Sequence, residues 1–169
     1  MWLLYETWVD HHAFVLTSHD ECIFVSILIV RGPHGAGHSL SVELLHTLQQ
    51  QVLRTGRTLD MRACGALCDF VALVIAARTA GTEFVLLDPG DLVPEIRAHP
   101  DSGLSQAIDG LPAPYIDVHD DFGGPLRCFF GLHKAPVATI AIKGNIASGY
   151  RIGVDLALRR LACARRSCS

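Results

Sequence analysis

The sequence predicts a single α/β domain in which short buried strands run through glycine-rich turns into helices. Two stretches carry this prediction, residues 23–56 and 134–160. Each begins with a β-leaning apolar run, continues through a turn containing Gly, and ends with apolar residues at helical spacing. At 169 residues, 50% of them hydrophobic, the chain has the length of one domain and enough apolar side chain for a substantial core.

The first twenty residues are predicted to form an irregular segment, 1–20, ahead of a domain spanning 21–162. The first strong strand is Ile23–Val30, an almost wholly apolar and β-branched run of the kind that is buried on both faces. The turn after it, residues 31–38, is rich in Gly but lacks the Lys-Ser/Thr of a phosphate loop and contains no GxGxxG. His34 and His38 are four residues apart, but the glycines around them argue against a helix that would align them as ligands.

A helix follows this turn. Ser39 or Ser41 can cap it, and Glu43 suits its first turn. Gly56 is a plausible stop. Its apolar face is formed by Leu44, Leu45, Leu48, Val52 and Leu53.

The second strong strand is predicted at Phe70–Ala76, another continuous apolar run. A turn at 79–81 leads to a third apolar run that starts at Phe84. This run ends in Asp88-Pro89-Gly90-Asp91, whose composition is typical of a β-turn.

Residues 93–124 are rich in Pro, Gly, Asp and Ser and are predicted to form a long loop region, with short helices near 92–98 and 104–108. His119, Asp120 and Asp121 lie in it. These residues can serve as acid/base groups or metal ligands; the alternative, which we favour, is a solvated acidic loop. A short helix is expected over 125–132.

The last unit is a strand at Val137–Ile142, a turn at Gly144 and a helix through Ile152–Leu161. A helix that starts directly after such a turn presents free N–H groups to whatever lies there, so the turn can receive a developing oxyanion. The alternative is a structural turn with nothing bound. The four arginines near the end, within a basic tail at 163–169 and just before it, suit a solvated helix end.

Composition restricts the partners and the compartment. The net charge is −3, from fourteen basic and seventeen acidic residues, which argues against a general nucleic-acid binder. No run has the length of a membrane span, and Glu6 and Asp10 interrupt the apolar start in a way that a signal peptide does not. Six cysteines in such a chain indicate reduced thiols, and Cys64-x3-Cys68 lacks the second pair of a zinc site. We expect a cytoplasmic protein with no metal, no nucleic-acid partner and no membrane partner.

Three segments together resemble the crotonase (enoyl-CoA hydratase/isomerase) superfamily. The strand–turn–helix from Pro136 to Leu161 is similar to the signature region of that family. The Arg31-Gly32-Pro33 turn with Leu40–Leu44 is similar to its first unit, and Phe84 with Gly90-Asp91-Leu92 to its oxyanion-hole loop. The resemblance implies a crotonase-like (ClpP/crotonase) fold, a spiral of repeated ββα units, incomplete at the C-terminus in a short, diverged or truncated member.

The resemblance also implies a site. The amides of Gly90 and Gly149 would form an oxyanion hole for an acyl-CoA thioester and stabilise its enolate, and Phe84, Asp91 and Leu92 would border the CoA. The implied activity is that of a lyase or isomerase on an acyl-CoA substrate, with no separate cofactor. Ile152 stands where hydratases place a catalytic Glu. The alternative is therefore an inactive subunit that pairs with itself or with a full-length crotonase partner; a Clp-type protease is a remoter option, because its serine is not recognisable.

Overall fold

The computed structural model describes residues 26–35, 40–78, 81–120, 126 and 132–166. The predicted irregular segment 1–20, the first residues of the Ile23–Val30 strand and nearly all of the expected helix at 125–132 lie outside these residues. The strands are β1 (Ile27–Arg31), β2 (Leu59–Ala63), β3 (Phe84–Asp88), β4 (Tyr115–His119) and β5 (Ala138–Ala141). The helices are α1 (Val42–Leu53), α2 (Leu67–Ala77), α3 (Val93–Ala98), α4 (Leu104–Asp109) and α5 (Ile146–Arg166), with a 3₁₀ turn at Gly90–Leu92 before α3.

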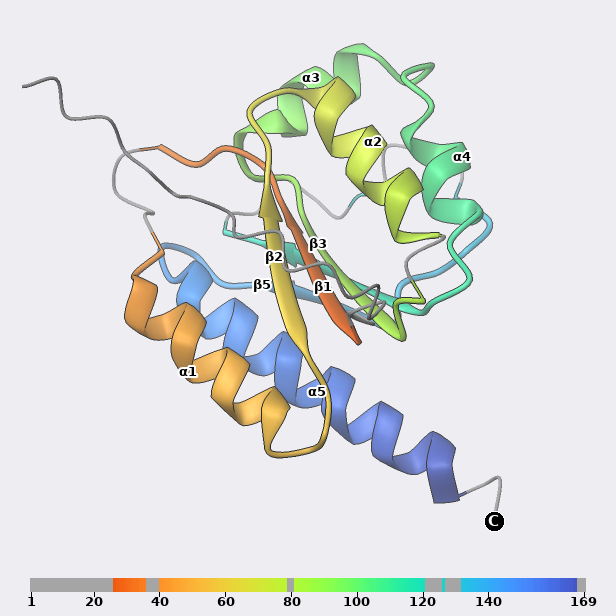
Figure 1. Ribbon diagram of the computed structural model, residues 1–169. Coiled ribbons are helices and arrows are strands. Elements are labelled where there is room, and N and C mark those ends of the chain that lie inside the picture. Colours follow the sequence, from red (N-terminus) through yellow and green to blue (C-terminus); the bar gives the residue numbers. More distant parts are fainter. Residues whose placement is uncertain (1–25, 36–39, 79–80, 121–125, 127–131, 167–169) are drawn as a thin grey trace, which may run out of the picture.

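The strands form one sheet in the order β2-β1-β3-β4-β5, and every neighbouring pair is parallel. Helices α2, α3 and α4 cover one face of the sheet, and α1 and α5 cover the other (Figure 1). This strand order with helices on both faces is the doubly wound, flavodoxin-like arrangement. The connections from β1 to β2, from β2 to β3 and from β3 to β4 each pass over a face of the sheet through a helix, as parallel strands require.

The sheet separates two apolar cores. Along β1, Leu28 and Val30 belong to the core under α2, α3 and α4, whereas Ile27 and Ile29 belong to the core under α1 and α5. All four side chains are at most 1% exposed. Burial of one such side chain stabilises the fold by about 1.5–3 kcal/mol. Burial on both faces explains why this strand reads as a continuous apolar run.

The predicted crotonase spiral is wrong. A spiral of ββα units requires strands that follow one another without a helix and several turns of sheet. Here a helix lies between β1 and β2, between β2 and β3, and between β3 and β4, and the strands form one open parallel sheet. The strand–turn–helix pattern in the sequence was real, but it is shared by every α/β fold of this kind.

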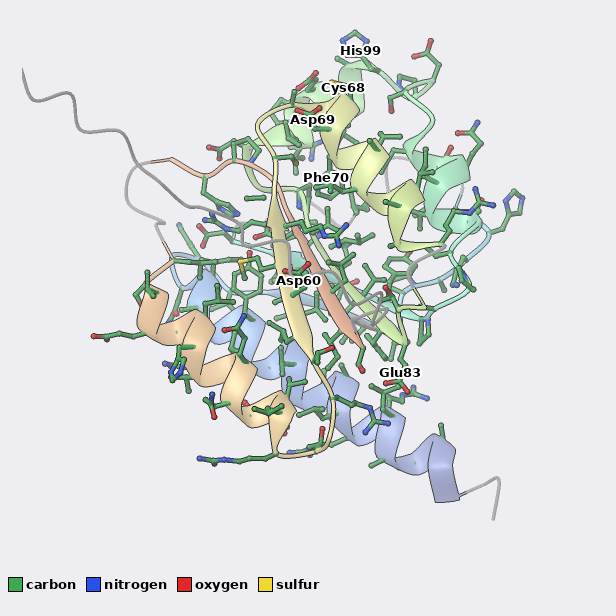
Figure 2. All side chains as sticks on the ribbon, in the orientation of Figure 1. Asp60, Cys68, Asp69, Phe70, Glu83 and His99 are labelled. Atoms are coloured by element: carbon green, nitrogen blue, oxygen red, sulfur yellow. The ribbon has the colours of Figure 1, made fainter. Side chains whose placement is uncertain are left out.

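The predicted strand at Phe70–Ala76 is also wrong, because this segment is the body of α2. Leu67, Phe70, Val71 and Val74 recur at helical spacing and are all buried against the sheet. Figure 2 shows Phe70 on α2, which covers that face of the sheet. The residues between them, Ala72, Leu73 and Ile75, are also apolar, so the run is apolar on nearly every side and its helical period is obscured.

The region 93–124 contains more structure than predicted. The two short helices are confirmed as α3 and α4. Strand β4 was missed, because Asp117 and His119 interrupt its apolar sequence although all five of its residues are buried. Strand β2 was missed for the same reason, since Asp60 and Arg62 lie within it.

The predicted helix after the first turn is confirmed as α1. Ser41 caps it, accepting a hydrogen bond from the Leu44 amide at 3.1 Å. Leu44, Leu48 and Val52 form its buried face. Gly56 follows the helix with a φ of +73°, which favours glycine.

The predicted strand at Val137–Ile142 is confirmed as β5, and the helix after it begins at Ile146, earlier than predicted. Gly149 and Gly153 lie inside α5, where a Cβ on Gly149 would meet Val118 at 3.1 Å and one on Gly153 would meet Leu86 at 2.7 Å. These two glycines therefore let α5 lie close to the sheet. The helix continues to Arg166, into the predicted basic tail. No described helix combines the length and apolarity needed to cross a membrane.

Candidate functional site

The candidate site lies where the parallel strands end. The arrowhead of β2 in Figure 1 marks the carboxyl edge of the sheet. In a doubly wound sheet, ligands bind outside the carboxyl ends of the strands, next to the point where the strand order reverses. That point lies between β1 and β3, the central pair of this sheet.

A cavity of about 310 Å³ occupies this edge, and we call it the edge cavity. Four strands contribute to it through the residues that end them or follow them. Its lining residues are His34 after β1, Gly90, Asp91 and Val93 after β3, His119 and Asp120 at the end of β4, and Lys143 and Gly144 after β5.

Two glycine–proline turns bring the ends of β1 and β3 together. A Cβ on Gly32 would lie 2.1 Å from the Pro89 carbonyl oxygen, and one on Gly90 would lie 2.2 Å from the Pro33 carbonyl oxygen. The Asp91 amide donates to that same Pro33 oxygen at 2.8 Å. Only glycine permits this approach, so the two turns interlock and place His34 against Gly90.

The end of β4 supplies a buried histidine–aspartate pair. Nε2 of His119 lies 2.8 Å from Oδ2 of Asp117, and the two side chains are 3% and 0% exposed. Nε2 of His119 has no hydrogen-bond partner among the described residues, so this contact is a close approach of the two groups and not a hydrogen bond. Asp117 also accepts the Leu126 amide at 2.8 Å on Oδ2, while its Oδ1 has no hydrogen-bond partner among the described residues. Asp117 therefore joins the segment after β4 to the strand and lies directly beside the His119 ring.

A second buried carboxylate, Asp88, lies at the end of β3 and is 0% exposed. Nε2 of His34 lies 2.8 Å from its Oδ2, and the hydroxyl of Tyr150 donates to the same oxygen. The Gly90 amide donates to Oδ1 at 3.1 Å. The turn after β1, the turn after β3 and helix α5 therefore all contribute donors or contacts to one carboxylate.

The Tyr150 hydroxyl is a hydrogen-bond donor in this network because it stays protonated. Burial, followed by the charge of Asp88 and the hydrogen bond to it, raises the pKa of the Tyr150 phenol far above its usual value, and Arg31 opposes this only in part. The phenol therefore stays protonated and donates its hydrogen to Asp88.

The two carboxylates approach the edge cavity from opposite faces of the sheet. Tyr115 shares its face of β4 with Asp117 and belongs to the core under α2, α3 and α4. Phe84 and Leu86 share their face of β3 with Asp88 and belong to the core under α1 and α5, as does Tyr150. His119 and His34 thus reach the same cavity from two sides.

The segment after β5, which includes Lys143 and Gly144, lines the edge cavity and is hydrogen-bonded to the end of β4 through backbone groups. The Ile142 amide donates to the His119 carbonyl at 3.1 Å, and the Gly144 amide to the Asp120 carbonyl at 3.3 Å. Gly144 has a φ of +69°. Lys143, which is exposed, lines the edge cavity together with Asp91 and Asp120.

The residues implied by the crotonase resemblance are not brought together. Gly90 and Asp91 line the edge cavity, whereas Phe84 and Leu92 are buried in separate cores and Gly149 lies within α5. The Gly149 amide donates to the Asn145 carbonyl at 3.4 Å, and the Gly90 amide donates to Asp88. Both amides are therefore used inside the chain.

The sequence identified the residues that β4 contributes to the cavity as candidates, but not His34 after β1 or Asp88 at the end of β3. His119 and Asp120 were noted as acid/base candidates, but the preferred solvated loop is wrong for His119, which is 4% exposed. His34 was set aside because glycines surround it, and Asp88 was read only as part of a turn. The available signal was positional: both directly follow an apolar strand, and such residues gather at one edge of a parallel sheet.

Other polar clusters lie elsewhere. Cys68 and His99 line a surface hollow of about 320 Å³ near the start of α2 and the end of α3, and Figure 2 shows both far from Glu83 at the opposite edge of the sheet. Within the part of the chain that the structure describes, no group of three or more His, Cys, Asp or Glu residues is arranged to hold a metal ion. The edge cavity is therefore our candidate site, because two buried histidine–aspartate pairs border it.

Comparison with known proteins overturns the crotonase resemblance. No family model matches the chain. A 3-dehydroquinate dehydratase of Pseudomonas savastanoi pv. phaseolicola is 27% identical over 156 residues, covering 91% of this chain and 99% of the relative. One from Stutzerimonas stutzeri is 28% identical over 142 residues, covering 83% of this chain and 92% of the relative. The acyl-CoA substrate, the enoyl-CoA chemistry and a crotonase partner are not supported by any of these relatives.

Solved structures agree on the fold. A type II dehydroquinase from Propionibacterium acnes superposes with a TM-score of 0.57 at 19% identity, covering 78% of this chain and 96% of the other. A 3-dehydroquinate dehydratase-like protein from Bifidobacterium longum superposes with a TM-score of 0.53 at 19% identity, covering 80% of this chain and 96% of the other. The chain is thus similar in sequence, over most of its length, to 3-dehydroquinate dehydratases, and shares its fold with type II dehydroquinases.

Proposed function

We propose that this protein is a lyase that removes water from 3-dehydroquinate or a closely related cyclic hydroxy ketone acid. The observation that carries the proposal is the edge cavity, with His119 held beside the buried Asp117 at the carboxyl edge of the sheet. The relatives named for this reaction cover up to 91% of the chain.

The reaction needs proton transfer at two places. A base removes a proton from the carbon next to the ketone, and the electron pair forms an enolate and then the new carbon–carbon double bond. The C–O bond to the leaving hydroxyl breaks, and an acid gives that oxygen a proton, so that water departs. His119 is suited to be the acid, because its ring lines the edge cavity and is held with Nε2 at 2.8 Å from Oδ2 of Asp117.

The charges of the edge cavity fit a substrate that carries both a carboxylate and hydroxyl groups. Lys143 is an exposed cation that can pair with the carboxylate. Asp91 and Asp120 can accept hydrogen bonds from hydroxyl groups. Acid–base elimination needs neither an electron carrier nor a group carrier, so we propose no cofactor. Among the described residues, Cys64 and Cys68 form no disulfide, and reduced thiols fit the cytoplasmic location that we propose.

The test is turnover of 3-dehydroquinate by the purified chain, followed by ultraviolet absorbance of the conjugated enone that dehydration forms. We expect His119→Gln to lower kcat by roughly 10²–10⁴-fold, the usual contribution of a general acid. We expect Lys143→Met to raise KM about tenfold with kcat nearly unchanged, because it removes binding that is equal in the ground and transition states. Arg54→Met, on an arginine that lines a separate hollow, is the matched control for the loss of a cation. Absence of turnover by the wild-type chain would refute the proposal.

A further inference from the structure

A groove of about 470 Å³ lies at the opposite edge of the sheet from the edge cavity, and we call it the amino-edge groove. It forms where β3, β4 and β5 begin and where the last turns of α5 run past them. Figure 2 shows Glu83 at this edge. The residues that matter for its chemistry are Glu83 and Phe84 at the start of β3, Val137 before β5, and Arg160, Leu161 and Ala164 on α5.

The amino-edge groove is separate from the edge cavity. Phe84 and Asp88 are the two ends of β3, which places them about 13 Å apart at the rise of a parallel strand. Phe84 lines the groove, whereas the edge cavity begins at Gly90, beyond Asp88. A ligand in one therefore does not occupy the other.

The walls of the groove are apolar. Phe84 is 0% exposed to solvent and belongs to the core under α1 and α5, and Val137 and Leu161 pack against that core. Among the described lining residues, Glu83 and Arg160 alone carry charge. Apolar walls with a small number of polar groups, in a space of this volume, are the usual form of a small-molecule site.

The negative charge in the groove is already paired inside the chain. Oε2 of Glu83 accepts a hydrogen bond from Nε of Arg57 at 2.9 Å, and Arg57 is only 5% exposed. A buried guanidinium without a carboxylate beside it would be strongly destabilising. Glu83 is therefore engaged by Arg57, and its charge is balanced before any ligand arrives.

The positive charge in the groove has no such partner on its own helix. The residues three and four positions from Arg160 are Leu156, Ala157, Cys163 and Ala164. None of them is acidic, so no carboxylate lies one helical turn away. The neighbouring Arg159, by contrast, pairs with Asp155 at 2.7 Å. Within the part of the chain that the structure describes, Arg160 forms no ion pair. The groove thus combines apolar walls with one unbalanced cation.

We propose that the amino-edge groove is a binding site for a small carboxylic acid with a compact apolar body. The planar guanidinium of Arg160 suits a carboxylate, which it binds through charge-assisted hydrogen bonds. The apolar walls take up the hydrocarbon part of the ligand and remove it from water. An amine is disfavoured because it brings a second cation to Arg160. The site does not depend on the dehydratase function.

The test is isothermal titration calorimetry of octanoate into the purified full-length chain. Octanoate has a carboxylate and a short hydrocarbon chain, and its ten non-hydrogen atoms should give a Kd of about 1 mM. Acetate has the same head without the chain, and octylamine has the same chain with the opposite charge. We expect each of them to bind at least about tenfold more weakly than octanoate.

Three variants locate the site. Arg160→Met keeps the apolar stem but removes the cation, so it should weaken octanoate binding about tenfold and leave octylamine binding no weaker. Arg159→Met is the matched control, because Arg159 is adjacent to Arg160 but does not line the groove, and its affinity should equal that of the wild type. Ala164→Trp changes an exposed residue and fills the groove, so it should abolish octanoate binding although Arg160 remains.

Lys143→Met tests for binding at the edge cavity instead, since Lys143 is an exposed cation there, and it should not change the octanoate affinity. The proposal is overturned if octanoate gives no saturable heat, or if acetate or octylamine binds as tightly. It is also overturned if Arg159→Met or Lys143→Met weakens octanoate binding as much as Arg160→Met does. None of these measurements uses turnover of 3-dehydroquinate, so their failure would leave the dehydratase function standing.

Discussion

At the scale of the residue, two glycines determine whether the site can exist. Gly32 and Gly90 let the turns after β1 and β3 pass within van der Waals contact of each other, each glycine against the carbonyl of a proline in the opposite turn. Gly90 also has a φ of +53°. Through this contact the His34 ring is placed beside Gly90 and Asp88.

We predict that Gly90→Ala destabilises the protein far more than Gly56→Ala. Gly56 has a φ of +73° but no atom within 4 Å of an added Cβ, so alanine there should cost about 1–2 kcal/mol for its conformation alone. At Gly90 the same cost is joined by a clash with backbone, which adds roughly 1–3 kcal/mol. Urea unfolding of both variants measures the difference. Equal losses of stability would mean that the turns do not interlock.

Histidines were visible in the sequence, but their surroundings were not. His119 and Asp120 could be named as acid/base candidates because they stand together in one run. The partner of His34 is Asp88, fifty-four residues away, and Tyr150 lies sixty-two residues beyond Asp88. No local spacing connects these residues, so only the tertiary structure could reveal the network.

At the scale of the element, one aspartate fixes the approach to β5. Asp109, at the end of α4, accepts the amides of His133 and Lys134 at 3.0 and 2.9 Å, and Nδ1 of His133 lies 3.0 Å from its second oxygen. The Lys134 amide, followed by the His133 side chain, lowers the pKa of the Asp109 carboxyl below its usual value of 3.8. The ionised form is therefore the one that holds the chain as it enters β5.

The pH dependence of this contribution has a definite sign. Because the folded pKa of Asp109 is lower than the unfolded one, its stabilisation is complete above the unfolded pKa and is lost as the pH falls through the folded pKa. We predict that the difference in unfolding free energy between the wild type and Asp109→Ala is full at neutral pH and shrinks below about pH 3.8.

Denaturant unfolding at several pH values measures this difference. His133→Gln is the companion variant: it removes the side-chain contact but keeps both backbone hydrogen bonds, so its effect should be smaller at every pH. A difference for Asp109→Ala that stays constant from neutral pH into strong acid would contradict the account.

At the scale of the whole molecule, the topology selects the site. The order β2-β1-β3-β4-β5 makes the chain leave β1 and β3 toward opposite faces of the sheet, and the turns that follow diverge around a crevice. His34, Asp88 and His119 all lie at this carboxyl edge. Binding of a ligand here should therefore stabilise the whole fold, since four of the five strands end at the edge cavity.

We predict that 3-dehydroquinate raises the melting temperature of the His119→Gln variant, which should bind the ligand without consuming it. A ligand in hundredfold excess over its Kd that binds only the folded chain contributes roughly 2.7 kcal/mol. Crotonyl-CoA at the same excess over a micromolar Kd should leave the melting temperature unchanged. A shift with crotonyl-CoA and none with 3-dehydroquinate would reverse the assignment of the substrate.

The sequence by itself determined the α/β class, the helix capped by Ser41, the two short helices α3 and α4, and the strands that read as apolar runs. These features depend on local periodicity and capping. It did not determine the strand order or the sheet's single open form, because crotonase spirals and doubly wound sheets share the strand–turn–helix unit. It misread α2, whose buried helical stripe lies in an apolar run, and passed over β4, whose Asp117 and His119 are polar. Only the tertiary structure decided these, since burial of a polar residue depends on the partners that distant parts of the chain bring to it.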